Sequence, residues 1–97
     1  MKAVKRLEII VNSPDLEEVI EVLEQLKIAG YTIIKEVVGK GERGIQDGDG
    51  LTNVFTNAYI LVACEEKQLA TLLTPLQELL EEVGGVCLVS DAYWLIN

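Results

Sequence analysis

Midway along the chain the sequence reads Tyr31-Thr32-Ile33-Ile34-Lys35-Glu36-Val37-Val38, followed by Gly39-Lys40-Gly41-Glu42-Arg43-Gly44. A largely apolar run ends there in a glycine loop that fits the dinucleotide fingerprint G-x-G-x-x-G by letters alone. That fingerprint requires a helix directly after it, because the pyrophosphate binds at the helix N-terminus. Residues 45–53 show no helical period and contain further glycines. The stretch therefore excludes a Rossmann domain and predicts a strand that runs into a glycine loop able to approach an anion.

The composition is that of one small globular domain spanning 1–97. Sixteen acidic against eight basic residues give a net charge of −8, which disfavours a nucleic-acid partner, because such partners need a basic surface. No stretch reaches membrane-spanning length, and the first residues lack the apolar run of a signal peptide. We therefore expect a cytoplasmic protein with reduced thiols and no transmembrane segment.

Residues that usually carry catalysis or bind metals are missing or isolated. The chain has no histidine, and Cys64 and Cys87 fit no metal or redox spacing. Glu42 has no neighbouring nucleophile or second carboxylate, so it does not suggest a catalytic acid. Asp47 and Asp49 resemble the start of a calcium-binding loop, but the residues that follow do not fit that pattern. Both aspartates are typical of turns. The sequence therefore predicts no catalytic residues, no metal site and no enzyme.

Apolar periodicity predicts the element order strand, helix, strand, strand, helix, strand. The strands are expected at 7–11, 31–38, 54–63 and 86–95. We expect Ser13 to cap the first helix, with Pro14 at its first position, and Gly30 to close it. Pro75 is expected to kink or restart the second helix, which Gly84-Gly85 ends.

This order predicts an α+β, ferredoxin-like βαββαβ fold: an antiparallel sheet with two helices on one face. The other face should be polar if it met water, yet the first and last strands carry apolar residues on both sides. We therefore expect another copy of the chain to cover it in a closed homo-oligomer. Tyr93 and Trp94 could stack on a ligand, but their place in a strand favours such an interface.

Nearly the whole chain resembles the PII signalling superfamily. The resemblance rests on Lys5-Arg6-Leu7-Glu8-Ile9-Ile10, Ala29-Gly30-Tyr31-Thr32, the loop 39–44 and Val83-Gly84-Gly85-Val86. Gly-Lys-Gly-x-Arg is especially similar to the PII-like branch associated with bicarbonate uptake and carboxysomes. The resemblance implies a homotrimer that senses adenine nucleotides in clefts between subunits and acts through a T-loop, here the segment 39–53.

Site residues follow from this resemblance position by position. Thr32 would lie near the adenine, and Ile9, Ile60 and Val62 would line the base. The remaining implied contacts are with phosphate or carboxylate groups, and they fall on the T-loop base and on the turn before the last strand: Gly39, Lys40, Gly41, Arg43, Gly84 and Gly85. For Lys40 and Arg43 the alternative is that both side chains merely solvate a loop.

Two cationic elements of the family have no counterpart in this sequence. The turn at Gly84-Gly85 carries no lysine, and residues 93–97 offer no cation where typical members have paired arginines. A triphosphate carries about four negative charges, each of which needs charge-assisted contacts. AMP, ADP, a cyclic nucleotide or bicarbonate is therefore easier to accommodate than ATP.

Two functions follow as hypotheses. The first is a regulatory protein of nitrogen or carbon metabolism that senses an adenine nucleotide (AMP, ADP or ATP) or bicarbonate and acts through the loop 39–53 on a target protein, a transporter or an enzyme. The alternative is a CutA-like or other structural trimer that binds no nucleotide. CutA-like proteins have been linked to divalent metals, but the missing histidines argue against a tight transition-metal site.

Overall fold

The computed structural model describes residues 1–39 and 56–97. Most of the predicted loop 39–53, including Lys40, Gly41 and Arg43, lies outside the described residues. The described elements are β1 (Lys2–Asn12), the short 3-10 helix η1 (Ser13–Asp15), α1 (Leu16–Gln25), β2 (Tyr31–Val37), β3 (Asn57–Cys64), α2 (Glu66–Val83) and β4 (Val86–Trp94). Apart from η1, this is the expected βαββαβ order, and the ferredoxin-like fold is confirmed.

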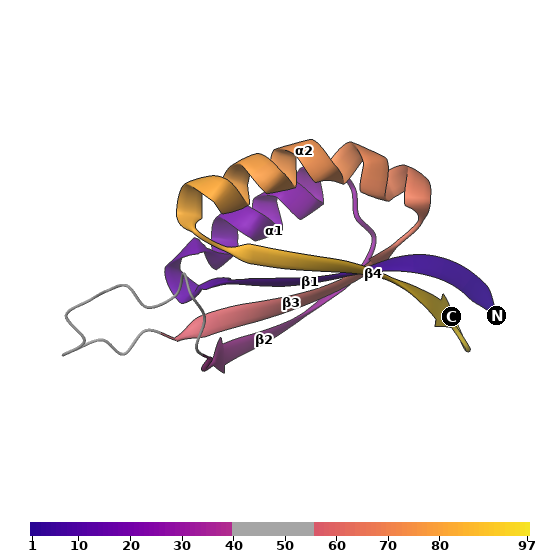
Figure 1. Ribbon diagram of the computed structural model, residues 1–97, viewed down its shortest axis with the longest axis horizontal. Helices are drawn as coiled ribbons and strands as arrows, with labels where there is room; N and C mark the ends of the chain where they lie inside the picture. Colours follow the sequence, from indigo (N-terminus) through magenta and orange to yellow (C-terminus); the bar gives the residue numbers. More distant parts are fainter. Residues whose placement is uncertain (40–55) are drawn as a thin grey trace.

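The four strands form one antiparallel sheet in the order β2-β3-β1-β4. Both helices lie on the same face of this sheet, and the two chain termini meet at one of its ends (Figure 1). Strands β2 and β4 are the edges, so each leaves one side of its backbone unpaired by the sheet.

The core lies between the sheet and the two helices. Alternate residues of β1 point into it, and Leu7, Ile9 and Val11 are almost completely buried. Their cross-strand neighbours on β3 and the apolar stripes of both helices complete the layer. The buried partners are Val19, Leu23, Ala58, Ile60, Val62, Leu72, Leu76 and Leu80.

Strand β1 begins five residues earlier than the apolar run that predicts it. Residues 2–6 are mostly polar, but they pair with the end of β4, where Lys2 faces Trp94 and Lys5 faces Asp91. The Lys5 ammonium lies 2.6 Å from the Asp91 carboxylate. The predicted boundary was wrong here because cross-strand pairing, and not hydrophobicity, extends the strand.

The predicted cap of the first helix was also wrong. Ser13 lies in η1 and α1 begins at Leu16, with Asp15 as its N-cap residue. The Ser13 hydroxyl instead lies 2.8 Å from the Thr56 hydroxyl and donates to the Thr56 carbonyl oxygen at 3.0 Å. These bonds tie the start of the helix to the residue just before β3.

The predicted end of α1 was also wrong. The helix stops at Gln25, and Lys27, with φ of 57°, takes the left-handed conformation that we expected of Gly30. The Ile28 amide then donates to the Leu23 carbonyl oxygen at 3.0 Å. A lysine therefore occupies a position that normally favours glycine or asparagine.

Pro75 does not restart the second helix, because α2 continues through it from Glu66 to Val83. A capping box lies at the start of the helix, where Glu65 and Gln68 exchange hydrogen bonds. At the other end Gly84, with φ of 81°, supplies the left-handed C-cap, as the sequence predicts.

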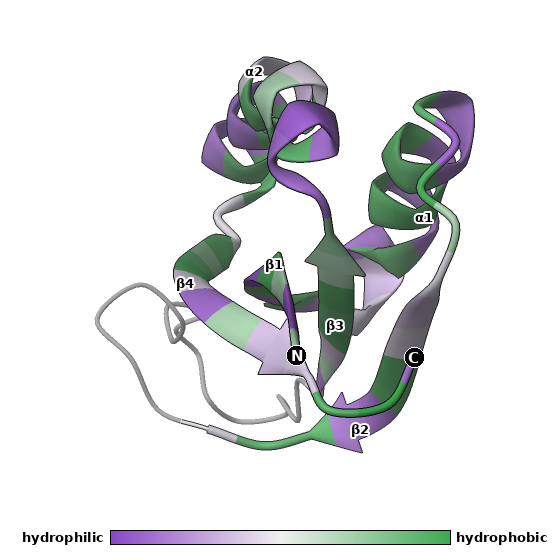
Figure 2. Cartoon of the chain, turned by 90° about the vertical axis from the view of Figure 1, so that its right-hand side faces the viewer, coloured by the Kyte–Doolittle hydropathy of each residue, from purple (hydrophilic) through white to green (hydrophobic). Residues whose placement is uncertain are grey.

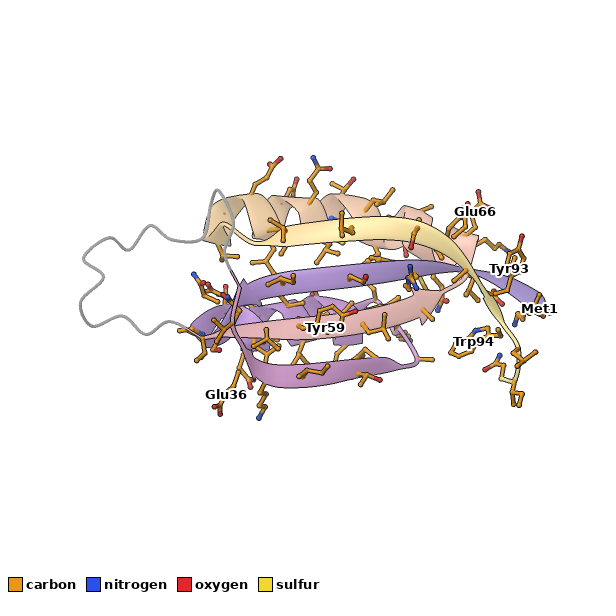
Figure 3. The ribbon with its side chains drawn as sticks, turned by 60° about the horizontal axis from the view of Figure 1, so that its bottom comes forward. Met1, Glu36, Tyr59, Glu66, Tyr93 and Trp94 are labelled. Atoms are coloured by element: carbon orange, nitrogen blue, oxygen red, sulfur yellow. The ribbon has the colours of Figure 1, made fainter. Side chains whose placement is uncertain are left out.

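The face of the sheet opposite the helices is open and largely apolar. Ile10 pairs with Val86 on one side and with Tyr59 on the other, and Ile34 continues this row onto β2. In the next row Leu88 leaves 69% of its surface exposed. Figure 3 looks obliquely onto this face, where Tyr59 lies near the middle of the sheet. The expectation that both faces are apolar is thus confirmed.

Candidate functional site

A groove of about 830 Å³ lies at the end of the sheet where the two termini meet. Strands β2, β3 and β1 supply its floor, and the bent end of β4 and the first turn of α2 supply its walls. The lining side chains used below are Lys2, Tyr31, Thr32, Leu61, Ala63, Glu65, Lys67 and Trp94. Two other hollows, of about 380 and 260 Å³, are smaller.

The apolar part of the groove comes from the sheet and from Trp94. Thr32 pairs with Leu61, so both stand on the open face together. Trp94 pairs with Lys2 near the end of β4 and is 37% exposed. In Figure 3 the Trp94 ring lies on the inner side of the bent end of β4 and faces the ends of β2 and β3. A flat aromatic surface therefore borders a shallow apolar floor.

The polar part of the groove contains two lysines. Lys2 lies 3.2 Å from the Glu65 carboxylate, and Glu65 is the one acid among the lining residues that the structure describes. Lys67, in the first turn of α2, forms no ion pair with any residue in the ranges 1–39 and 56–97. The lining thus combines two lysines with the Glu65 carboxylate and with Asn97, the last residue of the sequence, whose main-chain carboxylate is also negative.

Tyr31 fixes the rim of the groove next to Thr32. Its hydroxyl donates a hydrogen bond to the Glu24 carboxylate and so links β2 to α1. This bond raises the pKa of Tyr31 above its usual value, because the proton is shared with a carboxylate. Thr32 itself is exposed and free to contact a ligand.

The predicted glycines lie at the opposite end of the sheet. Gly84 and Gly85 form the turn between α2 and β4, and Gly39 follows the end of β2. The register places Val37, Asn57, Asn12 and Val86 at this end, whereas the groove lies near Lys2 and Trp94. Thr32 and Gly39 are seven residues apart, which spans roughly 23 Å in a regular strand and somewhat less here, because the pairing is irregular between Ile34 and Val37 and Glu36 has a φ of 63°.

The three apolar residues predicted to line a base do not face the groove. Ile9, Ile60 and Val62 are completely buried between the sheet and the helices. Their side chains therefore reach no ligand from inside this chain, and their predicted role finds no support in the position of these side chains. Leu61, which alternates with Ile60 and Val62 along β3, points to the open face instead.

A second, smaller hollow of about 380 Å³ lies between α2 and the edge strand β4. Its lining includes Leu73, Leu76, Val89 and Cys87. Burial raises the pKa of the Cys87 thiol to about 11, so this thiol is protonated and unreactive near neutral pH. Among the described residues, no group of three metal-binding side chains gathers here or elsewhere.

Comparison with known protein families identifies the family of this chain. The family model of the nitrogen regulatory protein P-II matches residues 4–95, which is almost the entire chain. The chain belongs to the P-II family. This confirms the predicted resemblance to the PII superfamily. The family consists of nitrogen regulatory proteins, which agrees with the prediction that the chain is not an enzyme.

Solved structures of P-II-like proteins agree closely with this chain. CPII from Thiomonas intermedia K12, a nitrogen regulatory PII-like protein, was solved bound to ADP, AMP and bicarbonate. It is 30% identical, with a TM-score of 0.79 over 95% of this chain and 88% of CPII. Its apo form gives 26% identity and a TM-score of 0.75 over 95% and 91% of the two chains.

A more distant P-II-like structure supports the fold alone. The PII-like signalling protein from Thermus thermophilus is 23% identical, with a TM-score of 0.72 over 96% of this chain and 90% of its own. No curated protein matches the sequence. Neither described helix is long and apolar enough to cross a membrane.

Three groove residues were missed by the sequence-based prediction of a P-II site. Lys2 and Lys67 looked like ordinary surface lysines, and Trp94 was assigned to an interface. The groove brings these residues together only in three dimensions; Figure 2 looks at this end of the sheet, where the C-terminal tail crosses low in the view and α2 begins above β3. Lys67 comes three residues after the last residue of β3 and lies in the first turn of α2.

Proposed function

We propose that this chain is a PII-like regulatory protein that senses an adenine nucleotide or bicarbonate in clefts between copies of itself. The copies form a homotrimer, and the ligand-bound trimer acts on a target protein, a transporter or an enzyme, through the segment 39–53. The whole chain, 1–97, forms the single domain of each subunit.

This proposal rests on the distance between the two groups of residues that are predicted to contact the ligand. Thr32 stands in the groove near one end of the sheet, whereas Gly39, Gly84 and Gly85 lie at the other end. Roughly 20 Å of strand is longer than the reach of one small ligand. The two groups of contacts meet only if the groove of one copy faces the glycine turn of the next.

The open sheet face supplies a reason for the copies to associate. Ile10, Ile34 and Leu88 leave a broad apolar surface that a single chain does not cover. In the middle of this surface one carboxylate oxygen of Glu8, Oε1, is buried without a hydrogen-bond partner among the described residues.

Its relatives suggest which ligands to test. CPII, the relative that is 30% identical, was solved with ADP, AMP and bicarbonate together. The present groove is large enough for a nucleotide, since small-molecule sites typically enclose about 300–1,000 Å³.

Thermal unfolding of the purified chain with AMP, ADP, ATP and bicarbonate tests the proposal. A ligand at 100 times its Kd stabilises the native state by about 2.7 kcal/mol, and this shifts the melting temperature of a small domain by several degrees. We expect such a shift with at least one of these compounds. An unchanged melting temperature with all four compounds at millimolar concentration would rule out ligand sensing.

A trimer without a nucleotide is the second candidate. It is favoured by the turn at Gly84-Gly85, which runs directly into Val86 with no cation to hold a phosphate. A trimeric mass combined with a flat thermal response indicates this CutA-like function. For either function we propose a cytoplasmic location, in keeping with the free thiols of Cys64 and Cys87.

A further inference from the structure

We infer that Glu36 is a positioning residue. A β-bulge around its left-handed backbone keeps the base of the segment 39–53 on the open face of the sheet, the face that carries Thr32. This inference rests on the proposed function and deepens it, because it says how the glycine base comes to lie on the face that we propose neighbouring copies to cover.

The pairing of β2 with β3 contains one extra residue on β2. Ile34 pairs with Tyr59 and Val37 pairs with Asn57, so β2 advances by three positions where β3 moves by two. Such an insertion in one strand of an antiparallel pair is a β-bulge. Within it Glu36 has φ of 63°, a left-handed conformation that normally favours glycine. The bulge is therefore centred on a residue that is poorly suited to it.

The bulge decides on which face of the sheet β2 ends. Tyr59 and Asn57 are two residues apart on β3, so both lie on the open face. Val37 pairs with Asn57 and lies on that face with it. In a regular strand Glu36 would pair with Asn57, and Val37 would turn to the face that the helices cover. Gly39 follows Val37 at the two-residue period of extended backbone, so the bulge also brings the glycine base to the open face.

Local preferences alone favour the regular strand. Regular alternation would place Val37 on the side of Ile33, which packs against the core, and would add an apolar side chain there. It would also spare Glu36, a residue with a Cβ atom, the left-handed conformation. Backbone strain of this kind is typical of functional positions. The bulge thus points to a requirement on where the strand ends and not on what its side chains bury.

The β3 side of this pairing is fixed by contacts with β1 and η1. Asn57 also pairs with Asn12 at the end of β1. Just before it, the Ser13 amide donates to the Thr56 carbonyl oxygen at 3.0 Å, and the two hydroxyl oxygens lie 2.8 Å apart. Sliding β3 to restore regular pairing with β2 would break these contacts, whereas a bulge in the edge strand β2 breaks none of them. The extra residue is therefore absorbed at Glu36.

The Glu36 side chain does not explain the conformation of its backbone. The side chain is exposed, and neither of the two ion pairs among residues 1–39 and 56–97 includes it. In Figure 3 Glu36 lies at the end of β2 that is far from Trp94, and it projects outward from the sheet. The left-handed backbone, and not the carboxylate, is therefore the property to test.

Substitutions at Glu36 in the full-length chain test the backbone first. Glu36→Gly and Glu36→Asn remove the carboxylate and tolerate a left-handed conformation, so both should keep the bulge. Glu36→Val should lose it, because a β-branched residue strongly disfavours a positive φ. Backbone nuclear Overhauser contacts of Asn57 report the register: they should come from Val37 in the parent and in the first two variants, and from residue 36 in Glu36→Val.

Two single-residue deletions then test the face on which the glycine base lies. Deleting Glu36 removes the extra residue, so a regular strand again pairs Val37 with Asn57 and Gly39 stays on the open face. Deleting Val38, which is 85% exposed and outside the core, shortens the chain equally but turns Gly39 to the other face. Calorimetric Kd values for ADP should stay within about threefold of the parent for the first deletion. They should rise about tenfold or more for the second, the cost of losing one charge-assisted contact.

The outcomes distinguish this inference from the proposed function. Contacts of Asn57 with residue 36 in the parent chain, or equal Kd values for the two deletions, overturn the inference and leave ligand sensing intact. Loss of ADP binding in Glu36→Asn also overturns it, because the carboxylate would then be the contributing group. If the parent binds neither ADP nor another nucleotide, ligand sensing of nucleotides fails, and the register in Glu36→Val alone decides whether Glu36 sets the face.

Discussion

A Cβ atom added at Gly85 would lie 2.7 Å from Cγ1 of Val11, so the turn after α2 can approach β1 only because residue 85 has no side chain. The same atom would lie 2.8 Å from a methyl carbon of Leu80 and 3.1 Å from the Ile10 carbonyl oxygen. The turn at Gly84-Gly85, which is predicted to contact a phosphate or carboxylate group, therefore packs directly against the core of the domain. The glycine at 85 is therefore required by packing, whatever ligand the turn meets.

Gly85→Ala should lower the free energy of unfolding by about 1–3 kcal/mol, the usual cost of overpacking a tight site. Urea denaturation measures this change. Gly30→Ala is the control, because nothing lies within 4 Å of a Cβ at Gly30, and its effect should be neutral or slightly stabilising. Equal stability of Gly85→Ala and the parent chain would contradict the packing described here.

Lys27→Gly should stabilise the chain. Lys27 has φ of 57°, a conformation that costs a residue with a Cβ about 1 kcal/mol relative to glycine. Allowing for the greater freedom of glycine in the unfolded chain, we expect a gain of about 0.5 kcal/mol in urea. Lys27→Ala removes the same side-chain charge and keeps the strain, so a similar gain from alanine would show that the charge and not the backbone is responsible.

The stability of the chain should fall as the pH rises from about 9 to about 11. Burial raises the pKa of Cys87 from 9.0 to about 11, so the native thiol keeps its proton in a range where the unfolded thiol loses it. The native state then binds more protons than the unfolded state, and the free energy of unfolding decreases with pH. Burial raises the pKa of Cys64 in the same direction.

Cys87→Ala isolates this effect in urea titrations at pH 8, 9, 10 and 11. The variant should lose less stability across this range than the parent chain does, while both keep a parallel slope below pH 8. Superimposable curves for the two proteins over the whole range would show that Cys87 is not buried in the native state.

Leu88→Glu should prevent self-association. Leu88 is 69% exposed on the open face and pairs with Glu8, so a second carboxylate there adds repulsion to a surface that we propose to be buried between copies. Light scattering should give about three times the chain mass of 10.7 kDa for the parent and a single chain for the variant. Leu73→Glu, on the helical layer with 46% exposure, should keep the parent mass.

Most of the fold could be predicted because it depends on local pattern. The alternation of apolar and polar residues in β1 and the apolar stripe of α1 identify the buried side of each element. Gly84 marks the end of α2. The errors arose where tertiary contacts decide the outcome. The Ser13 hydroxyl donates a hydrogen bond to the Thr56 carbonyl oxygen instead of capping its own helix. Lys27 adopts the left-handed conformation that the sequence predicts for Gly30.

The site was less predictable than the fold for a related reason. Thr32 lies in the groove, but Ile9, Ile60 and Val62 belong to the core, and the direction of a strand residue depends on register that the sequence leaves open. Lys67 and Trp94 are 27 positions apart in the sequence and share the groove only in three dimensions. Their chemistry is visible only after the fold is known.

The central claim is that each site is built from two copies, and mixing two defective variants tests it most directly. Thr32→Glu places a negative charge in the groove, and Gly39→Asp does so at the base of the loop, where a Cβ meets nothing within 4 Å. Each variant alone should bind no anionic ligand. Unfolded and refolded together in equal amounts, they should regain calorimetric binding of ADP at about a quarter of the sites, where an intact groove faces an intact glycine end. No recovery in mixed oligomers of confirmed trimeric mass would contradict the account, because both halves of the site would then belong to one chain.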